Sequence, residues 1–177
     1  MRFQHNQLEA IMKFACEGSS VAFQNGLVFD GQTLIASDGL SIVKVTDPYS
    51  EPQGQQFLIP LDPVRLALTA TEDQEPIWIN VGEVQFVNMV IKYETRVGEI
   101  PDFKKVLFQK PWVEGYPTKF FTIHPKRLSA AMYVCRAFNL VGNVDISHDP
   151  TSEIIFLSSR HRLGHRVEIA LMGNQLW

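Results

Sequence analysis

Three segments of the 177-residue chain repeat the same order of predicted elements, and this repeat constrains the fold more than any other feature. In each segment a short apolar stretch predicts a strand, the next residues show helical periodicity, and about three further strands follow. The segments align on Leu8, Leu66 and Leu128, at spacings of 58 and 62 residues. We call residues 1–47 unit one, residues 56–109 unit two and residues 119–177 unit three.

Apolar residues at positions i, i+3, i+4 and i+7 predict one helix in each unit, because this spacing forms a single stripe along a helix. The stripes are Leu8, Ile11, Met12 and Ala15 in unit one, Val64, Ala67, Leu68 and Thr71 in unit two, and Leu128, Ala131, Met132 and Cys135 in unit three. We expect Leu8, Leu66 and Leu128 to be buried at equivalent positions. Asp62 is expected to cap the second helix, and Pro125 suits the first turn of the third.

The strands after each helix are predicted from short apolar runs separated by turn residues. The predicted strands are Val21–Phe23, Leu27–Phe29, Thr33–Ser37 and Ser41–Val45 in unit one, Ile77–Val81, Val84–Val90 and Ile91–Arg96 in unit two, and Asn143–Ser147, Glu153–Ser158 and Arg166–Leu171 in unit three. The dipeptides Asn25-Gly26, Asp30-Gly31 and Asp38-Gly39 favour tight hairpin turns.

One helix on one small sheet leaves sheet edges and an apolar stripe uncovered, so each unit needs a partner. We expect units one and two to pair into a domain over residues 1–109, followed by a linker at 110–118 and the single unit three. The fold class is therefore α+β.

Composition excludes several classes of protein. Apolar residues make up 45% of the chain and the net charge is −3, which excludes a mainly disordered chain and a strongly basic nucleic-acid-binding protein. No apolar stretch approaches the roughly 20 residues of a membrane-spanning helix, and no signal peptide is recognisable. The two cysteines lie in apolar periodic segments, so we interpret them as buried thiols of a cytoplasmic protein.

Two short motifs resemble segments of the bacterial DNA polymerase beta sliding clamp family. Residues 35–42, Ile-Ala-Ser-Asp-Gly-Leu-Ser-Ile, are similar to the family's A-T-D-G-x-x-L segment. Residues 98–107, Gly-Glu-Ile-Pro-Asp-Phe-Lys-Lys-Val-Leu, are similar to its G-x-[FY]-P-[DN]-[YF]-x-[RK]-[VL] segment. The motifs occur in the family's order, inside half-domains of the family's kind. The resemblance implies the DNA-clamp (processivity) fold.

The resemblance also implies a pocket that binds short peptides of DNA polymerases and clamp loaders. Carried over by position, the pocket residues are Ser37, Gly39, Leu40, Ile42, Pro101, Lys105 and Val106. Leu40 and Ser41 replace the family's usual His-Arg, so partner preference is expected to differ. The alternative interpretation is a hairpin and loop packed only for stability.

The resemblance places the helices on the inner wall of a ring that surrounds duplex DNA. The third helix carries Lys126, Arg127 and Arg136 without an acidic residue, and we expect these three to face one open surface. Lys13 and Arg65 are the candidates on the other two helices, although acidic residues lie near both. Phosphate contacts need charge and carry no base code, which suits sliding. The alternative is a solvated helix face.

A further basic cluster covers residues 160–166, Arg-His-Arg-Leu-Gly-His-Arg. His161 and His165 have a spacing that binds zinc on a helix, but Gly164 and the flanking apolar runs favour a hairpin, and no third ligand accompanies the pair. A basic hairpin tip that contacts phosphate or a neighbouring subunit, and a solvated tip, both remain open.

The sequence contains no recognisable catalytic motif, and we expect neither enzymatic activity nor a cofactor nor a metal. Our main hypothesis is a polymerase processivity factor that encircles DNA as a homo-oligomeric ring. The family's ring contains twelve half-domains, so three units per chain favour a homotetramer in which unit three pairs with its copy and the dimers join through unit one. The alternative is a clamp-like module that binds replication proteins without encircling DNA.

Overall fold

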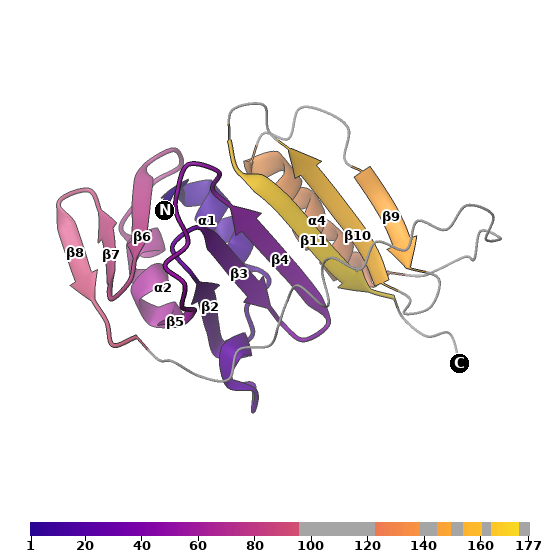
Figure 1. Cartoon of the computed structure of the whole chain (residues 1–177), viewed down its shortest axis with the longest axis horizontal. Helices are drawn as coiled ribbons and strands as arrows, with labels where there is room; N and C mark the ends of the chain where they lie inside the picture. The colour runs from indigo at the N-terminus through magenta and orange to yellow at the C-terminus, as the bar shows by residue number, and fades with distance from the viewer. Residues whose placement is uncertain (96–122, 139–144, 150–153, 161–163, 174–177) are drawn as a thin grey trace.

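The computed structural model describes residues 1–95, 123–138, 145–149, 154–160 and 164–173, which form helices against two antiparallel sheets (Figure 1). The first sheet has the order β1-β6-β7-β8 and the second the order β5-β2-β3-β4-β11-β10-β9. The elements are β1 (Arg2–Gln4), α1 (His5–Met12), the 3-10 helix η1 (Ala22–Asn25), β2 (Gly26–Phe29), β3 (Thr33–Ser37), β4 (Ser41–Thr46), β5 (Phe57–Pro60), α2 (Leu61–Thr69), β6 (Pro76–Asn80), β7 (Glu83–Phe86), β8 (Met89–Lys92), α4 (Pro125–Ala137), β9 (Asp145–Asp149), β10 (Ile154–Arg160) and β11 (Arg166–Met172).

Units one and two exchange strands. The strand before the helix of unit one, β1, pairs with β6, the first strand after the helix of unit two. Reciprocally, β5 of unit two pairs with β2 of unit one. Each unit therefore completes the sheet of the other, as expected for a paired domain. The predicted linker at 110–118 lies outside the described residues, so the domain boundaries stay a prediction.

Unit three continues the sheet of unit one. The last strand of unit one, β4, pairs antiparallel with the last strand of unit three, β11, from Thr46↔Arg166 to Ser41↔Leu171. The expectation that unit one keeps a free edge for joining other chains is wrong, because β11 occupies that edge. Among the described strands, β1 and β8 form the edges of the first sheet, and β5 and β9 form the edges of the second.

The helices begin at His5, Leu61 and Pro125, which places Leu8, Val64 and Leu128 at the fourth position of each. Leu8 and Val64 are fully buried. The expectation that Leu66 and Leu128 are buried as well is wrong, since they are 55% and 43% exposed. The residue of unit two that is equivalent to Leu8 is Val64, two positions before Leu66. Leu128 is in register, but it lies on the side of α4 that the described residues leave open.

The buried stripe of α4 differs from the predicted one. Ala131 and Cys135 are buried as expected, but they share the core-facing side with Val134 and Phe138, while Met132 is 46% exposed. In unit two the predicted stripe is confirmed, with Val64, Ala67 and Thr71 buried. The periodicity therefore predicted the helices correctly, and the choice of face failed in unit three.

The Asp-Gly turns of unit one are confirmed. Gly31 and Gly39 have φ of +93° and +86°, a left-handed conformation that glycine adopts without a Cβ penalty. The Asp30 carboxylate accepts hydrogen bonds from the backbone amides of Gln32 and Thr33, at 3.0 and 2.6 Å. Asp38 accepts from Leu40 and Ser41 in the same way. Both turns fix the register of β2-β3-β4.

Three local predictions are wrong. The predicted strand Val21–Phe23 is not formed; residues 22–25 form η1 instead, because the Asn25 side chain bonds the backbone of Ser19 and closes a compact loop. The predicted strand 84–90 is interrupted at Val87, whose φ of +47° turns the chain between β7 and β8. Asp62 is not the helix cap, since the N-cap of α2 is Pro60 and Asp62 lies inside the first turn of the helix.

Candidate functional site

The three helices form a layer on one side of the sheets (Figure 1). α1 lies in the middle and contacts both α2 and α4. The α2 contact belongs to the strand exchange between units one and two. The α4 contact accompanies the β4–β11 pairing. The helix layer is therefore continuous across all three units, which is the arrangement the DNA-contact hypothesis needs.

A crevice of about 360 Å³ lies between α1 and α4. Its lining consists of Lys13 from the end of α1 together with Lys126, Ser129, Ala130 and Tyr133 from α4. These four α4 residues have the spacing i, i+3, i+4, i+7, so they share one face of the helix. The structure thus brings two of the predicted cations, Lys13 and Lys126, to one site, beside hydroxyl groups of Ser129 and Tyr133.

Glu9 partly neutralises this site. Its carboxylate lies 3.5 Å from the Lys13 ammonium and accepts a hydrogen bond from the Tyr133 hydroxyl. The Lys13 ammonium also lies 4.6 Å from the centre of the Tyr133 ring. The Tyr133 hydrogen bond, with a smaller contribution from Lys13, lowers the pKa of Glu9 below its ordinary value, and the same bond raises the pKa of Tyr133 to about 12. Lys126 is therefore the less compensated cation of the two. The sequence indicates Glu9 as an acidic residue near Lys13, but it does not indicate Tyr133, because the pairing of Tyr133 with Glu9 depends on the α1–α4 contact.

The three cations of α4 do not share one surface. Arg127 and Arg136 are nine residues apart, which is two and a half helical turns, so they lie on opposite sides of the helix. The guanidinium of Arg127 donates to the backbone carbonyl of Met172 at the end of β11, 3.5 Å away. Arg136 is exposed near the C-terminal end of α4. The expectation of a common face is wrong for Arg127, which serves the contact between α4 and β11.

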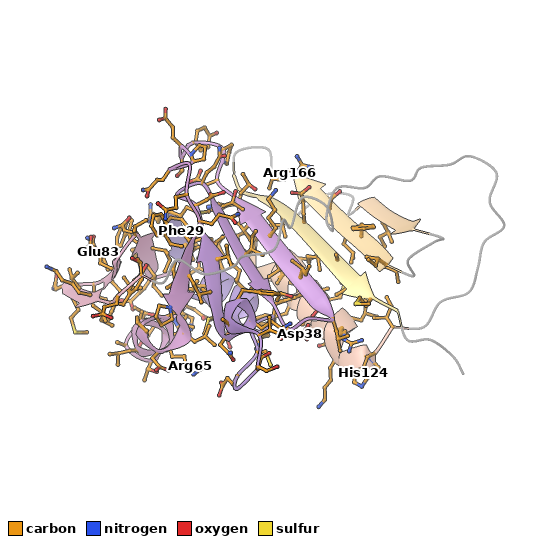
Figure 2. All side chains as sticks on the ribbon, turned by 60° about the horizontal axis from the view of Figure 1, so that its bottom comes forward. Phe29, Asp38, Arg65, Glu83, His124 and Arg166 are labelled. Atoms are coloured by element: carbon orange, nitrogen blue, oxygen red, sulfur yellow. The ribbon has the colours of Figure 1, made fainter. Side chains whose placement is uncertain are left out.

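Arg65 on α2 is engaged by acidic side chains. It pairs with Glu17 and lies 3.4 Å from Asp62 on the same helix. Its charge is therefore largely compensated, and it contributes less positive potential than Lys126. Figure 2 shows Arg65 on the same lower side of the view as Asp38 and His124, whereas Arg166 lies at the opposite edge.

The predicted peptide-pocket residues of unit one surround the β3–β4 hairpin. Gly39 donates its backbone N–H to the Ser37 hydroxyl, and a side chain at Gly39 would collide with Gln24 of η1. Leu40 at the tip is 46% exposed, and Ile42 is partly buried against the outer face of the sheet. Pro101, Lys105 and Val106 lie outside the described residues.

Unit three adds one residue that sequence reasoning missed at this hairpin. The backbone N–H of Met172 donates to the carbonyl of Leu40, 2.9 Å away, so two exposed apolar residues, 46% (Leu40) and 42% (Met172), lie opposite each other at the end of the β4–β11 pairing. Asp38 and His124, the cap of α4, lie at the same end of the sheet (Figure 2). No local signal in the sequence indicates Met172, since its position depends on the pairing of units one and three.

Solved structures with a similar backbone identify the fold. The whole chain superposes on the DNA polymerase III beta subunit of Borrelia burgdorferi, solved with a natural product, with a TM-score of 0.61 and 10% identity. It superposes equally on the Helicobacter pylori beta clamp, solved with carprofen, over 99% of the chain with a TM-score of 0.60 and 10% identity. The chain has the sliding-clamp fold. The resemblance noted in the two motifs and the α+β assignment are confirmed at the level of the fold.

The clamp fold is covered only in part. The chain spans 63% of the Borrelia protein, 67% of the Helicobacter protein and 65% of the beta subunit from Streptococcus pyogenes, which matches with a TM-score of 0.52 and 10% identity. No protein-family model and no curated protein matches the sequence.

The structure describes part of the basic cluster at residues 160–166. His165 stacks on Phe3 of β1, with ring centres 5.3 Å apart, and meets the edge of Phe138 at 5.7 Å. His165 is thereby part of the packing between units one and three, and His161 lies outside the described residues. Within the described ranges no group of three or more His, Cys, Asp or Glu side chains could hold a metal ion.

Cys135 is buried in α4, and burial raises the pKa of its thiol, which disfavours the thiolate. Cys16 is partly buried. In the part of the chain that the structure describes, no helix is long and apolar enough to cross a membrane.

Proposed function

We propose that this protein is a DNA sliding clamp, a non-catalytic processivity factor of the cytoplasm that encircles duplex DNA and tethers replication proteins. The observation that carries the proposal is the continuous helix layer of a clamp fold, with Lys13 and Lys126 at its α1–α4 crevice and Arg136 exposed farther along α4. A ring that encloses DNA holds it by topology, so weak, sequence-independent phosphate contacts suffice.

Ring closure requires several chains. The clamp resemblance implies twelve half-domains per ring, and three units per chain then give a homotetramer. Unit three has an open flank on which Leu128 and Met132 are exposed, and β9 has a free outer edge among the described strands. The residues equivalent to Met132 in units one and two are Met12 and Leu68, and both are partly buried against the core. We propose that two copies of unit three pair about a two-fold axis and provide the missing flank.

The DNA contact is tested by the salt dependence of binding. We expect the Lys126→Ala variant to bind duplex DNA of any sequence more weakly, with the slope of log K against log salt concentration reduced by about 1, because one phosphate contact is lost. The Arg2→Ala variant, which removes a charge from β1 outside the helix layer, serves as the control. Equal slopes for the Lys126 variant and the unchanged protein would contradict a DNA path along α4.

A partner-binding role is favoured by the exposed apolar pair Leu40 and Met172. We propose that Ser37, Gly39, Leu40 and Ile42, with Pro101, Lys105 and Val106, bind short hydrophobic peptides of a polymerase or clamp loader. Apolar side chains of the peptide would lie against Leu40 and Met172, and polar groups at the rim would fix its register. This role would also suit a module that binds replication proteins without encircling DNA.

Calorimetry tests this site with a short peptide that carries a glutamine and a C-terminal Leu-Phe pair. We expect micromolar binding, about −8 kcal/mol, and its loss in the Leu40→Glu variant, because a carboxylate would be buried by the peptide. The Tyr49→Glu variant, at an exposed site on the β4–β5 connection, should bind normally. Undiminished binding by Leu40→Glu would remove the pocket assignment.

A further inference from the structure

The last strands of units one and three pair with each other, whereas the last strand of unit two, β8, pairs only with β7 of its own unit and has no described strand on its outer edge. The β4–β11 pairing is antiparallel and brings α1 and α4 side by side. β8 occupies the same place in unit two and forms the edge of its sheet. We call this combination of strand pairing and helix contact a joint. Within the described residues, β8 is the only last strand of a unit that takes part in no joint.

The first two residues of β8 expose apolar side chains at a sheet edge, and the only charge on the strand is the exposed Lys92 at its end. Met89 and Val90 are 51% and 54% exposed, and Val87 in the adjoining turn is 57% exposed. Val87 also has a φ of +47°, which strains a β-branched residue. An exposed apolar hairpin with a strained valine at its tip is unusual for a surface in contact only with water, and such patches mark interaction sites.

The helix of unit two, α2, packs on β7, next to β8 in the sheet, and shows the same incomplete contact. Ala10 and Ala130 are the sixth residues of α1 and α4, counted from His5 and Pro125. Ala10 is fully buried and Ala130 is packed against the core. The sixth residue of α2 is Leu66, which is 55% exposed. The flank of α2 that corresponds to the α1–α4 contact is therefore open.

The geometry points to a second copy of this chain as the occupant: β8 pairs antiparallel with β8 of the copy about a two-fold axis, and Leu66 of each α2 is covered by the other helix. An antiparallel pair of identical strands is compatible with two-fold symmetry, and the internal β4–β11 joint supplies the template for both the strand and the helix contact. Together with the pairing of unit three on which the proposed ring rests, this joint supplies the outer edge of β8 with a partner strand and closes four chains.

The test compares the solution mass of the full chain with two matched valine variants. By light scattering at micromolar concentration we expect four chains for the unchanged protein and two for Val90→Lys, because a buried lysine at the dyad blocks strand pairing while the unit-three contact persists. Val21→Lys, at a 40% exposed valine before η1, should keep four. Met89→Lys provides a second substitution at β8, and circular dichroism confirms that each variant is folded.

The outcomes separate the joint from the function. An unchanged mass for both β8 variants overturns the joint, whether the protein is then a dimer, a monomer in which the chain's own residues cover β8, or a complex held by other surfaces. A halved mass for Val90→Lys together with undetectable DNA binding by the unchanged protein keeps the joint and removes the sliding-clamp function.

Discussion

Truncating Leu8 to alanine should lower the free energy of unfolding of a single chain by about 2–5 kcal/mol, because the side chain is fully buried at the fourth position of α1. The removed methyl groups lose their transfer free energy and leave a cavity against the sheet. Urea unfolding, followed by tryptophan fluorescence over a range of chain concentrations, measures the loss.

The matched substitution is Leu128→Ala, at the same position of α4. Since Leu128 is 43% exposed, we expect a change of about 0.5 kcal/mol or less in the dilute chain. At higher concentration the same variant should associate more weakly, because Leu128 lies on the flank proposed to meet another unit three. Equal losses for the two variants in the dilute chain would contradict the exposure of Leu128.

Replacing Lys44 with methionine should lower the free energy of unfolding by about 1–3 kcal/mol, because it removes one of two cations from a buried carboxylate. Lys44 lies directly opposite Glu168 in the β4–β11 register, with 3.4 Å between the charged atoms, and the Glu168 side chain is 8% exposed. Arg166 donates to the same carboxylate over 2.6 Å and limits the loss. Burial lowers the pKa of Lys44, and Glu168 offsets part of that effect.

The double variant Lys44→Met/Glu168→Leu removes both charges of the pair and measures how strongly they interact. Without the carboxylate no buried charge is left unpaired, so the double variant should recover most of the stability lost in Lys44→Met. Urea unfolding of the four proteins in the cycle measures this. Losses that simply add would show that the pair does not couple units one and three.

Local patterns predicted the elements of this fold better than their packing. The hairpin turns at Asp30-Gly31 and Asp38-Gly39 follow from side-chain capping and a left-handed glycine, which act within four residues. Val87 carries no turn signal, because a β-branched residue avoids the conformation that it adopts between β7 and β8. The turn there is imposed by the pairing of both strands.

Two apolar stripes compete on α4, and periodicity alone cannot choose between them. Leu128 and Met132 are larger than Ala131 and Cys135, yet the smaller residues face the core. The choice depends on which neighbours exist: the corresponding leucine of unit one, Leu8, is fully buried, whereas the described residues leave this flank of unit three open. The same reason hid Tyr133 and Met172 from sequence reasoning, since both gain their role from contacts between units.

Retention on DNA of different topology tests the central claim most directly. The protein is assembled with nicked circular duplex DNA, the salt concentration is raised until phosphate contacts are screened, and gel filtration measures how much protein remains with the DNA before and after a single cut linearises it. Encirclement predicts retention on the circle and release after the cut. Equal retention on both forms, or release from both, would contradict a closed ring.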